Sequence, residues 1–247
     1  MLKWIEKYIF WVEFAIHKKM MVRKIKVYQS YFSAQVLDVG AGDKPYAKLF
    51  PQVSKYIATN TKSHYKNTND VVSYTDIWID DASSIPVNDN DFEGVLCFQV
   101  LSVIAQPDLF FKEAARILKP GGKLLLTTDF LYPPWSKEDN ARYSIQQLER
   151  FVEQAGLKPL KKESFGGFKS MQFSLLSRRI RSYPQRIKQA PHIWSKAYRG
   201  AIFLFYLLFL PMISLAGYLI YLMDKKVYDD FDFTFNLLIL AEKPLDK

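Results

Sequence analysis

Short runs of β-branched and aliphatic residues alternate with helical patterns along most of this chain. The alternation predicts strands over residues 35–39, 55–59, a segment ending near 79, 94–98, 123–128, 158–163 and 233–241. Helices are predicted over 108–118 and from a cap at Ser144 to Ala155, with Gly156 as the stop signal. Strands that alternate with helices are typical of βαβ units, so we expect an α/β fold with a mostly parallel sheet.

Composition sets broad limits on the class of protein. With 247 residues, 49% hydrophobic and 24% charged, the chain can bury a core for one domain with an appendage, and it is not a disordered chain. The single cysteine, Cys97, cannot form an internal disulfide, so we expect a reducing cytoplasm. His17, His64 and His192 lie far apart without the spacing of metal ligands, and no metal site is predicted.

The charge is unevenly distributed. The chain holds 34 basic and 25 acidic residues, a net charge of +9, which favours a membrane surface or a nucleic acid as a partner. The segment from Arg178 to Arg199 contains basic residues and no acidic one, and residues 200–223 directly after it carry no charge. An anionic membrane attracts such a basic cluster by roughly 1 kcal/mol per Lys or Arg. Since no nucleic-acid-binding motif is present, we expect a membrane surface and no nucleic acid.

Residues 36–43, Val-Leu-Asp-Val-Gly-Ala-Gly-Asp, are the most informative stretch. A buried strand runs directly into a loop in which Gly40 and Gly42 let the backbone approach a ligand, and Asp38 stands at the carboxyl end of the strand. In open α/β sheets ligands bind at that end. No third glycine follows at the spacing of a dinucleotide signature, so an enzyme that uses a nicotinamide cofactor is disfavoured.

Four segments in order, at family-like spacing, carry a resemblance to a known family. They are Asp-Val-Gly-Ala-Gly at 38–42, Asp-Ala-Ser-Ser-Ile-Pro at 81–86, Asp-Phe-Glu-Gly-Val-Leu at 91–96 and Glu-Ala-Ala-Arg-Ile-Leu-Lys-Pro-Gly-Gly at 113–122. Through them, residues 33 to 165 and the final strand resemble class I S-adenosylmethionine-dependent methyltransferases of the "methyltransferase type 11" kind. The resemblance implies a Rossmann-like seven-stranded sheet with helices on both faces, and S-adenosylmethionine as the cofactor.

The resemblance also implies roles for single residues. The loop would admit the methionine portion of the cofactor beside Asp38, Asp81 would face the adenine, and Phe98 would lie near the sulfonium or simply pack in the core. Asn60 stands where relatives carry an acid that binds the ribose hydroxyls, and its uncharged amide implies weaker cofactor affinity. The expected cofactor-binding residues are Asp38, Val39, Gly40, Ala41, Gly42, Asn60, Asp81, Ala82 and Phe98.

The segment over residues 128–144 resembles methyltransferases of bacterial surface-polysaccharide pathways. That resemblance implies that Asp129, Tyr132 and Arg142 orient a hydroxylated or acidic substrate; the alternative is that Arg142 is a surface charge. Relatives often carry Glu-His where this chain has residues 102–103, and Leu-His where it has residues 134–135, so no general base or other catalytic residue is assigned. In-line alignment of the acceptor with the activated methyl group can supply several kcal/mol of catalysis by itself.

Residues 200–223 are long and apolar enough to span a bilayer. In a sheet of this kind, strands six and seven are antiparallel neighbours, so a helix that crossed would have to recross within residues 224–232, which are too few and too polar. Pro211 predicts a kink or a helical hairpin instead. We therefore expect a monotopic anchor in one leaflet, with a buried helical subdomain, a dimer face or true spanning as alternatives.

These observations divide the chain into an N-terminal amphipathic helix (1–32), the methyltransferase core (33–167), a basic and apolar helical insertion (168–228) and the final strand with the C-terminus (229–247). Charged residues interrupt the N-terminal apolar positions, so this segment is not a signal peptide. It either packs on the domain and closes the cofactor site or lies in a membrane interface.

The sequence predicts a cytoplasmic methyltransferase on the inner face of the cell membrane. Its expected acceptor is a hydroxyl or carboxyl group of a small molecule or lipid-linked saccharide, which rests on the family resemblance and the membrane-facing features. The alternative is a methyltransferase-like protein that has lost catalysis and serves as a membrane-bound partner. The acceptor, the base and the oligomeric state stay open.

Overall fold

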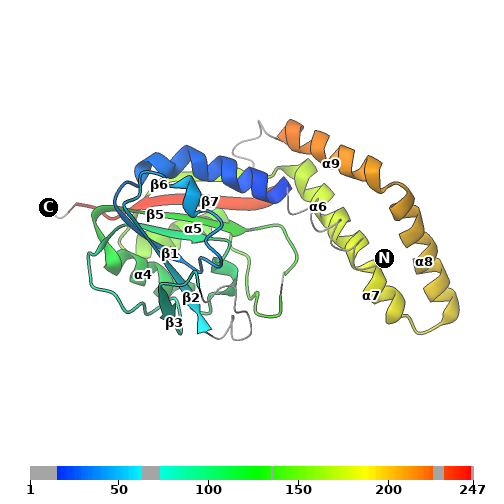
Figure 1. Ribbon diagram of the computed structural model, residues 1–247, viewed down its shortest axis with the longest axis horizontal. Helices are drawn as coiled ribbons and strands as arrows, with labels where there is room; N and C mark the ends of the chain where they lie inside the picture. The colour runs from blue at the N-terminus through cyan, green and yellow to red at the C-terminus, as the bar shows by residue number, and fades with distance from the viewer. Residues whose placement is uncertain (1–15, 63–72, 135, 225–230, 246–247) are drawn as a thin grey trace.

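A mixed sheet of seven strands lies at the centre of the computed structural model, which describes residues 16–62, 73–134, 136–224 and 231–245. The strand order is β3-β2-β1-β4-β5-β7-β6, and β7 runs antiparallel to both of its neighbours (Figure 1). The strands are β1 (Gln35–Val39), β2 (Lys55–Thr61), β3 (Ile77–Ile79), β4 (Phe92–Phe98), β5 (Leu118–Asp129), β6 (Lys158–Phe165) and β7 (Asn236–Glu242). The predicted Rossmann-like sheet is therefore confirmed.

The strands differ from their predicted bounds mainly at their ends. β1 matches its prediction, whereas β7 begins at Asn236, three positions later than expected. The largest difference is in β5, which already starts at Leu118 and includes the predicted turn at 119–122. Phe92 of β4 pairs with Leu118 and Gly94 with Lys123, so the turn residues form an irregularity inside the strand pairing and not a break before it.

Helices cover both faces of the sheet (Figure 1). On one face lie α4 (Pro107–Ile117) and α5 (Ile145–Gln154), and the Oγ of Ser144 caps α5 by accepting from the Gln147 N–H at 3.3 Å. On the other face lies the N-terminal helix, described over residues 16–28. Short 3-10 turns are η1 (Gln29–Tyr31), η2 (Ala47–Leu49) and η3 (Leu101–Val103).

Alternate residues of the central strands feed two hydrophobic cores. In β7, Leu237 and Ile239 pack with α4 and α5, while Leu238 and Leu240 pack with the N-terminal helix. This alternation follows from the period of two along a strand. Because both faces are covered, the central strands β1, β4 and β7 are largely apolar, which is why they could be predicted from sequence.

Between β6 and β7 the chain forms a helical arm, residues 168–224, that projects beyond the sheet (Figure 1). α7 packs against α8, and α6 packs against α9. Since β6 runs parallel to β5, the arm leaves the sheet at the carboxyl edge of the parallel strands, where ligand sites of α/β folds lie. The helices of the arm are α6 (Phe168–Arg181), α7 (Tyr183–Lys188), α8 (Ile193–Leu208) and α9 (Leu210–Asp224).

Residues 200–223 are kinked, as Pro211 predicts, but they do not form a hairpin of their own. α8 and α9 are bent by 63° at Phe209, and Pro211 lies in the first turn of α9, where the missing N–H breaks no helical hydrogen bond. The reversal of direction lies at residues 189–192, between α7 and α8. Residues 200–223 therefore make up most of α8 and α9, which form the second half of a longer hairpin whose first half is α6 and α7.

Among the described residues, no single helix is long and apolar enough to cross a membrane. α8 and α9 have the required length and composition only together, as a bent pair. Within the arm, a small core forms around Ile180, Tyr183 and Phe203.

Gly217 allows α9 to pack closely on α6 at the root of the arm. A Cβ at this position would lie 2.3 Å from Cζ of Phe173, so we expect Gly217→Val to lower the free energy of unfolding by about 1–3 kcal/mol through overpacking. Urea denaturation measures the difference. A matched control is Gly200→Ala in α8, where a Cβ meets open space and should stabilise by up to about 1 kcal/mol. Equal stability of the two variants would contradict the tight packing.

Candidate functional site

The loop that follows β1 is held against the end of β2. The N–H groups of Gly40 and Ala41 both donate to the Thr59 carbonyl oxygen at 3.0 Å. Gly40 has a φ of +71°, and a Cβ there would lie 2.7 Å from a methyl group of Val100. Glycine is therefore required at this position both by backbone conformation and by space.

Asn60 of β2 braces this loop from behind. Its Oδ1 accepts from the Gly42 N–H at 2.8 Å, and its Nδ2 donates to the Gly42 carbonyl at 3.1 Å and to Thr75 Oγ1 at 2.8 Å. The side chain is 1% exposed, so both ends of the amide are used inside the protein. Both ends of the Asn60 amide are thus engaged with Gly42 and Thr75. The contact of Asn60 with the cofactor ribose stays a prediction.

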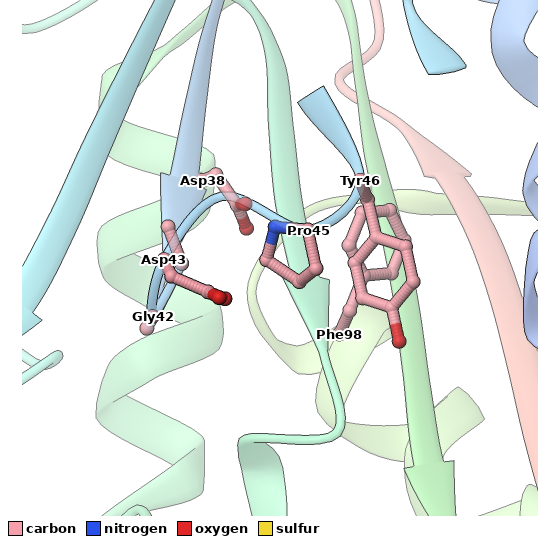
Figure 2. A pocket seen from close by; sticks show the side chains of 8 residues that line it. Asp38, Gly42, Asp43, Pro45, Tyr46 and Phe98 are labelled. Atoms are coloured by element: carbon pink, nitrogen blue, oxygen red, sulfur yellow. The ribbon is translucent and has the colours of Figure 1, made fainter. Parts of the chain in front are cut away.

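A pocket opens where the loop faces the end of β4 (Figure 2). Figure 2 shows the carboxylates of Asp38 and Asp43 on one side of it and the rings of Tyr46 and Phe98 on the other. The two rings meet edge to face with their centroids 5.3 Å apart. The pocket therefore has an acidic wall and an aromatic wall. Its lining residues are Asp38, Gly40, Ala41, Gly42, Asp43, Pro45, Tyr46 and Phe98.

Asp38 is a carboxylate that the fold buries at the base of the pocket. The Tyr56 hydroxyl donates to its Oδ2 at 2.5 Å. Burial raises the pKa of Asp38 to about 7, although the bond from Tyr56 and the charge of Lys44 act in the opposite direction. Burial, together with the charge of Asp38, raises the pKa of Tyr46 to about 12, so Tyr46 remains a neutral phenol.

The charges of this pocket suit a cationic ligand. Asp38 and Asp43 line it, and the neighbouring Lys44 is paired with Asp76 at 2.7 Å. S-adenosylmethionine carries a sulfonium and an ammonium group, and both carboxylates and aromatic faces attract such cations. The residues present therefore fit this cofactor, which supplies an activated methyl group when it is bound.

The structure gathers part of the predicted cofactor site in this pocket, namely Asp38, Gly40, Ala41, Gly42 and Phe98. Val39 is instead buried in the core beneath the loop. Asp81 and Ala82 follow β3 and do not line the pocket: Asp81 Oδ1 accepts from the Ser83 N–H at 2.7 Å, and Ala82 packs in the core. The predicted adenine contacts of Asp81 and Ala82 stay predictions.

Asp43, Pro45 and Tyr46 also line the pocket, although they were not among the expected cofactor-binding residues. They follow Gly42 directly, so their place in a ligand-approaching loop was the available signal. Phe98 packs in the core, as one of its two interpretations expects, and its position near the sulfonium stays a prediction. Its ring lines the pocket and also stacks on Phe50 with centroids 6.3 Å apart.

A second group of predicted residues lies at the carboxyl end of β5. Arg142 Nε donates to the Tyr132 carbonyl at 2.9 Å, and its guanidinium forms a two-pronged ion pair with Asp139, with Nη2 and Oδ2 2.7 Å apart. The bond with Asp139 foremost, and the charge of Asp129 as well, raise the pKa of Arg142. Asp129, Tyr132 and Arg142 thus come together, and Arg142 is an engaged residue and not an isolated surface charge. In the described part of the chain, no group of three or more His, Cys, Asp or Glu could hold a metal ion.

Comparison with known proteins agrees with this geometry. Residues 37–126 match the family model described as "Methyltransferase domain". Among solved structures, a SAM-dependent methyltransferase of Thermotoga maritima shares 14% identity, with 98% of this chain and 97% of that chain covered and a TM-score of 0.55. A candidate methyltransferase from Bacillus halodurans shares 19% (90% and 98% covered, TM-score 0.53), and the [4+2]-cyclase SpnF shares 19% (91% and 81%, TM-score 0.50). No curated protein matches the chain.

The matched segment begins in β1 and ends in β5, so it contains the glycine loop and the whole pocket. Domain match, fold and pocket chemistry agree: the chain is an S-adenosylmethionine-dependent methyltransferase of class I fold, and S-adenosylmethionine is its cofactor. At these identities the solved structures establish the fold alone.

Cofactor binding should strengthen as the pH rises through the pKa of Asp38. Below about pH 7 the free protein holds this carboxyl largely protonated, whereas a bound cation favours its ionised form. We expect the affinity for S-adenosylmethionine, measured by calorimetry, to increase about tenfold from about pH 6 to about pH 8 and then to level off. The Asp38→Asn variant should bind more weakly and without this dependence. A flat profile for the unaltered protein would contradict the role of Asp38.

The substitution Asn60→Asp distinguishes two roles of Asn60, bracing of the glycine loop and contact with the cofactor ribose. A carboxylate cannot donate to Gly42 and Thr75, and it would be buried, so we expect the free energy of unfolding to fall by roughly 2 kcal/mol. Cofactor binding should weaken with the distorted loop. Thermal unfolding and calorimetry measure the two effects, and tighter binding by this variant would instead support the ribose contact.

Proposed function

We propose that this methyltransferase acts at a membrane surface and transfers the methyl group to a hydroxyl or carboxyl group of a saccharide-type acceptor linked to a lipid. The exposed apolar surface of the helical arm carries this proposal, because the arm leaves the same edge of the sheet at which the cofactor pocket opens. The protein would then lie on the inner face of the cell membrane.

The outer surface of α8 and α9 is apolar and open to solvent. Trp194 is 83% exposed, Leu208 is 79% exposed and Met212 is 66% exposed. The other exposed large apolar residues of these helices and of the bend between them are Ile193, Tyr198, Leu204, Phe205, Phe209, Leu215, Tyr218, Leu219, Leu222 and Met223. Soluble monomers rarely expose a continuous apolar surface of this kind, and it marks a site of interaction with a membrane or a protein.

The charge of the arm favours an anionic bilayer over an apolar protein partner. Between Glu163 and Asp224 the sequence contains no acidic residue. Basic groups near anionic lipids contribute roughly 1 kcal/mol each, and Trp and Tyr are typical of the interface between lipid and water. The basic residues of this segment are Lys169, Arg178, Arg179, Arg181, Arg186, Lys188, Lys196 and Arg199.

The path of the chain favours insertion into one leaflet. The arm starts after β6 and returns to β7 at the same edge of the sheet, so it enters and leaves a bilayer from one side. α9 is also held to the domain, because it packs on α6 and the Lys19 ammonium lies 5.5 Å from the centre of the Tyr218 ring. A monotopic anchor needs no polar backbone to cross the hydrocarbon.

The acceptor class rests on two supports. Residues 128–144 resemble methyltransferases of surface-polysaccharide pathways, and the fold brings Asp129, Tyr132 and Arg142 together near the end of β5. Carboxylate, phenol and guanidinium groups are suited to hydroxylated or acidic sugars. The lipid link follows from the arm, which would hold the pocket beside the lipid headgroups.

The test uses phosphatidylglycerol vesicles that contain either glucosyl-diacylglycerol, which offers hydroxyls only, or glucuronosyl-diacylglycerol, which adds a carboxylate. With methyl-labelled S-adenosylmethionine, we expect label in at least one lipid and flotation of the protein with the vesicles. The variant with Leu204→Glu, Leu208→Glu and Met212→Glu should lose flotation and at least tenfold of the transfer, since each change places a charge on the apolar face.

The matched control is Leu245→Glu, a change at a residue that is 71% exposed but lies outside the arm, and it should float normally. Unchanged flotation of the triple variant would refute the anchor. A folded protein that floats but binds no S-adenosylmethionine would instead support the alternative of a non-catalytic membrane partner.

A further inference from the structure

The N-terminal helix brings a histidine to the carboxyl edge of the sheet. His17 Nε2 lies 3.2 Å from Asn236 Oδ1, and the His17 ring packs edge to face on Phe235 at 4.8 Å between centroids. Asn236 is the first residue of β7 and pairs in register with Asp129, the last residue of β5. Segments separated by 219 positions in the sequence thus meet at the end of β5.

This cluster lies on the same face of the sheet as the cofactor pocket. Phe98, which lines the pocket, pairs with Thr127 of β5. Thr127 Oγ1 contacts Met21 Sδ of the N-terminal helix at 3.4 Å, and Asp129 follows two positions later, about 7 Å further along the strand on the same face. An acceptor that approaches the sulfonium from the end of β5 would therefore pass between Phe98 and His17.

The environment of His17 keeps its imidazole neutral. Burial lowers the pKa of His17, and the negative charge of Asp129 and the bond to Asn236 offset this only in part. An amide oxygen accepts hydrogen bonds and does not donate them, so Nε2 holds the ring proton and Nδ1 keeps its lone pair. The charged groups around the cluster are Asp129 on β5, Arg142 near Asp129, and Arg178 of α6, which lies over the Tyr132 ring at 5.0 Å.

Two polar atoms near this path are buried without a hydrogen-bond partner among the described residues. They are a donor, Asn236 Nδ2, and an acceptor, Gln99 Oε1. Asn236 is completely buried, and Gln99, which directly follows Phe98, has a left-handed backbone with a φ of +61°. Buried polar groups are normally paired, so the two atoms point to a ligand that both donates and accepts, as a hydroxyl does.

We propose that His17 is the proton acceptor of the methyl transfer and that the acceptor group is a hydroxyl; this rests on the proposed function above. The hydroxyl oxygen forms a bond to the methyl carbon while the bond from that carbon to the sulfonium sulfur breaks. The electron pair of the broken bond stays on the sulfur of the product S-adenosylhomocysteine. The hydroxyl proton passes to Nδ1 of His17. Asp129 stabilises the resulting imidazolium, and Asn236 holds the ring in place.

Methyl transfer to glucosyl-diacylglycerol and to glucuronosyl-diacylglycerol distinguishes a role of His17 as the base from a purely structural role. A hydroxyl acceptor must lose its proton, so His17→Gln should lower transfer to glucosyl-diacylglycerol by about 100-fold or more. A carboxylate acceptor has no proton to lose and needs no base. Methyl-ester formation on the carboxylate of glucuronosyl-diacylglycerol, distinguished from methyl-ether formation by its cleavage in alkali, and the affinity for S-adenosylmethionine should change by less than about threefold. His192→Gln, an exposed position at the start of α8, is the matched control and should leave both reactions unchanged. An equal loss of methyl-ether and methyl-ester formation would mean a structural role and would overturn the proposal.

A second measurement needs no acceptor. The chain holds three histidines, so the imidazole resonances can be assigned with His17→Gln and His192→Gln and titrated by NMR. The sulfonium cation of S-adenosylmethionine should lower the pKa of His17 relative to the uncharged sulfur of S-adenosylhomocysteine. An identical titration in the two complexes would place His17 away from the reacting atoms and refute the proposal, while cofactor binding itself would still stand.

Discussion

The antiparallel insertion of β7 between β5 and β6 is the pairing on which the functional architecture depends. Its first residue, Asn236, pairs with Asp129 at the end of β5 and with Phe165 at the end of β6. Parallel strands already bring their carboxyl ends to one edge, and β7 makes the chain leave and re-enter the sheet there. The glycine loop, the group around Asp129 and the root of the arm therefore share one side of the molecule (Figure 1).

The pocket gains its chemistry from a carboxylate that the fold keeps out of water. Asp38 is buried, and within the described part of the chain its charged form is favoured by the Tyr56 hydroxyl and by the charge of Lys44. Such a site is stabilised when a cation enters, because the desolvated carboxylate then gains a partner. The same electrostatic logic describes the neutral His17, whose conjugate acid would be favoured by the neighbouring Asp129. The bound cation and the protonated imidazole would thus each be stabilised by a separate buried carboxylate, one on β1 and one on β5, with β4 between them.

The arm presents the opposite situation: large apolar side chains of α8 and α9 are exposed, and the basic residues of the arm precede residue 200 in the sequence. Leaving this much apolar surface exposed is unfavourable unless another phase covers it. A bilayer that covers the arm would also fix the distance of the pocket from the lipid headgroups, because α9 is packed against α6 and the N-terminal helix. The helical arm would then both anchor the protein on the membrane and select an acceptor that lies among the lipid headgroups.

The sequence by itself determined the strands, the glycine loop and the apolar insertion, because each depends on residues that are neighbours in the chain. Asp38 and Gly40 could be assigned to a ligand site from the end of their strand, and the family resemblance added Phe98. Tertiary structure decided what local patterns do not encode: that Asn60 braces the loop, that the arm reverses at 189–192, and that His17 reaches Asn236. A side chain takes its role from the partners that folding brings to it, and those partners come from distant segments whose approach is set by the packing of the whole sheet.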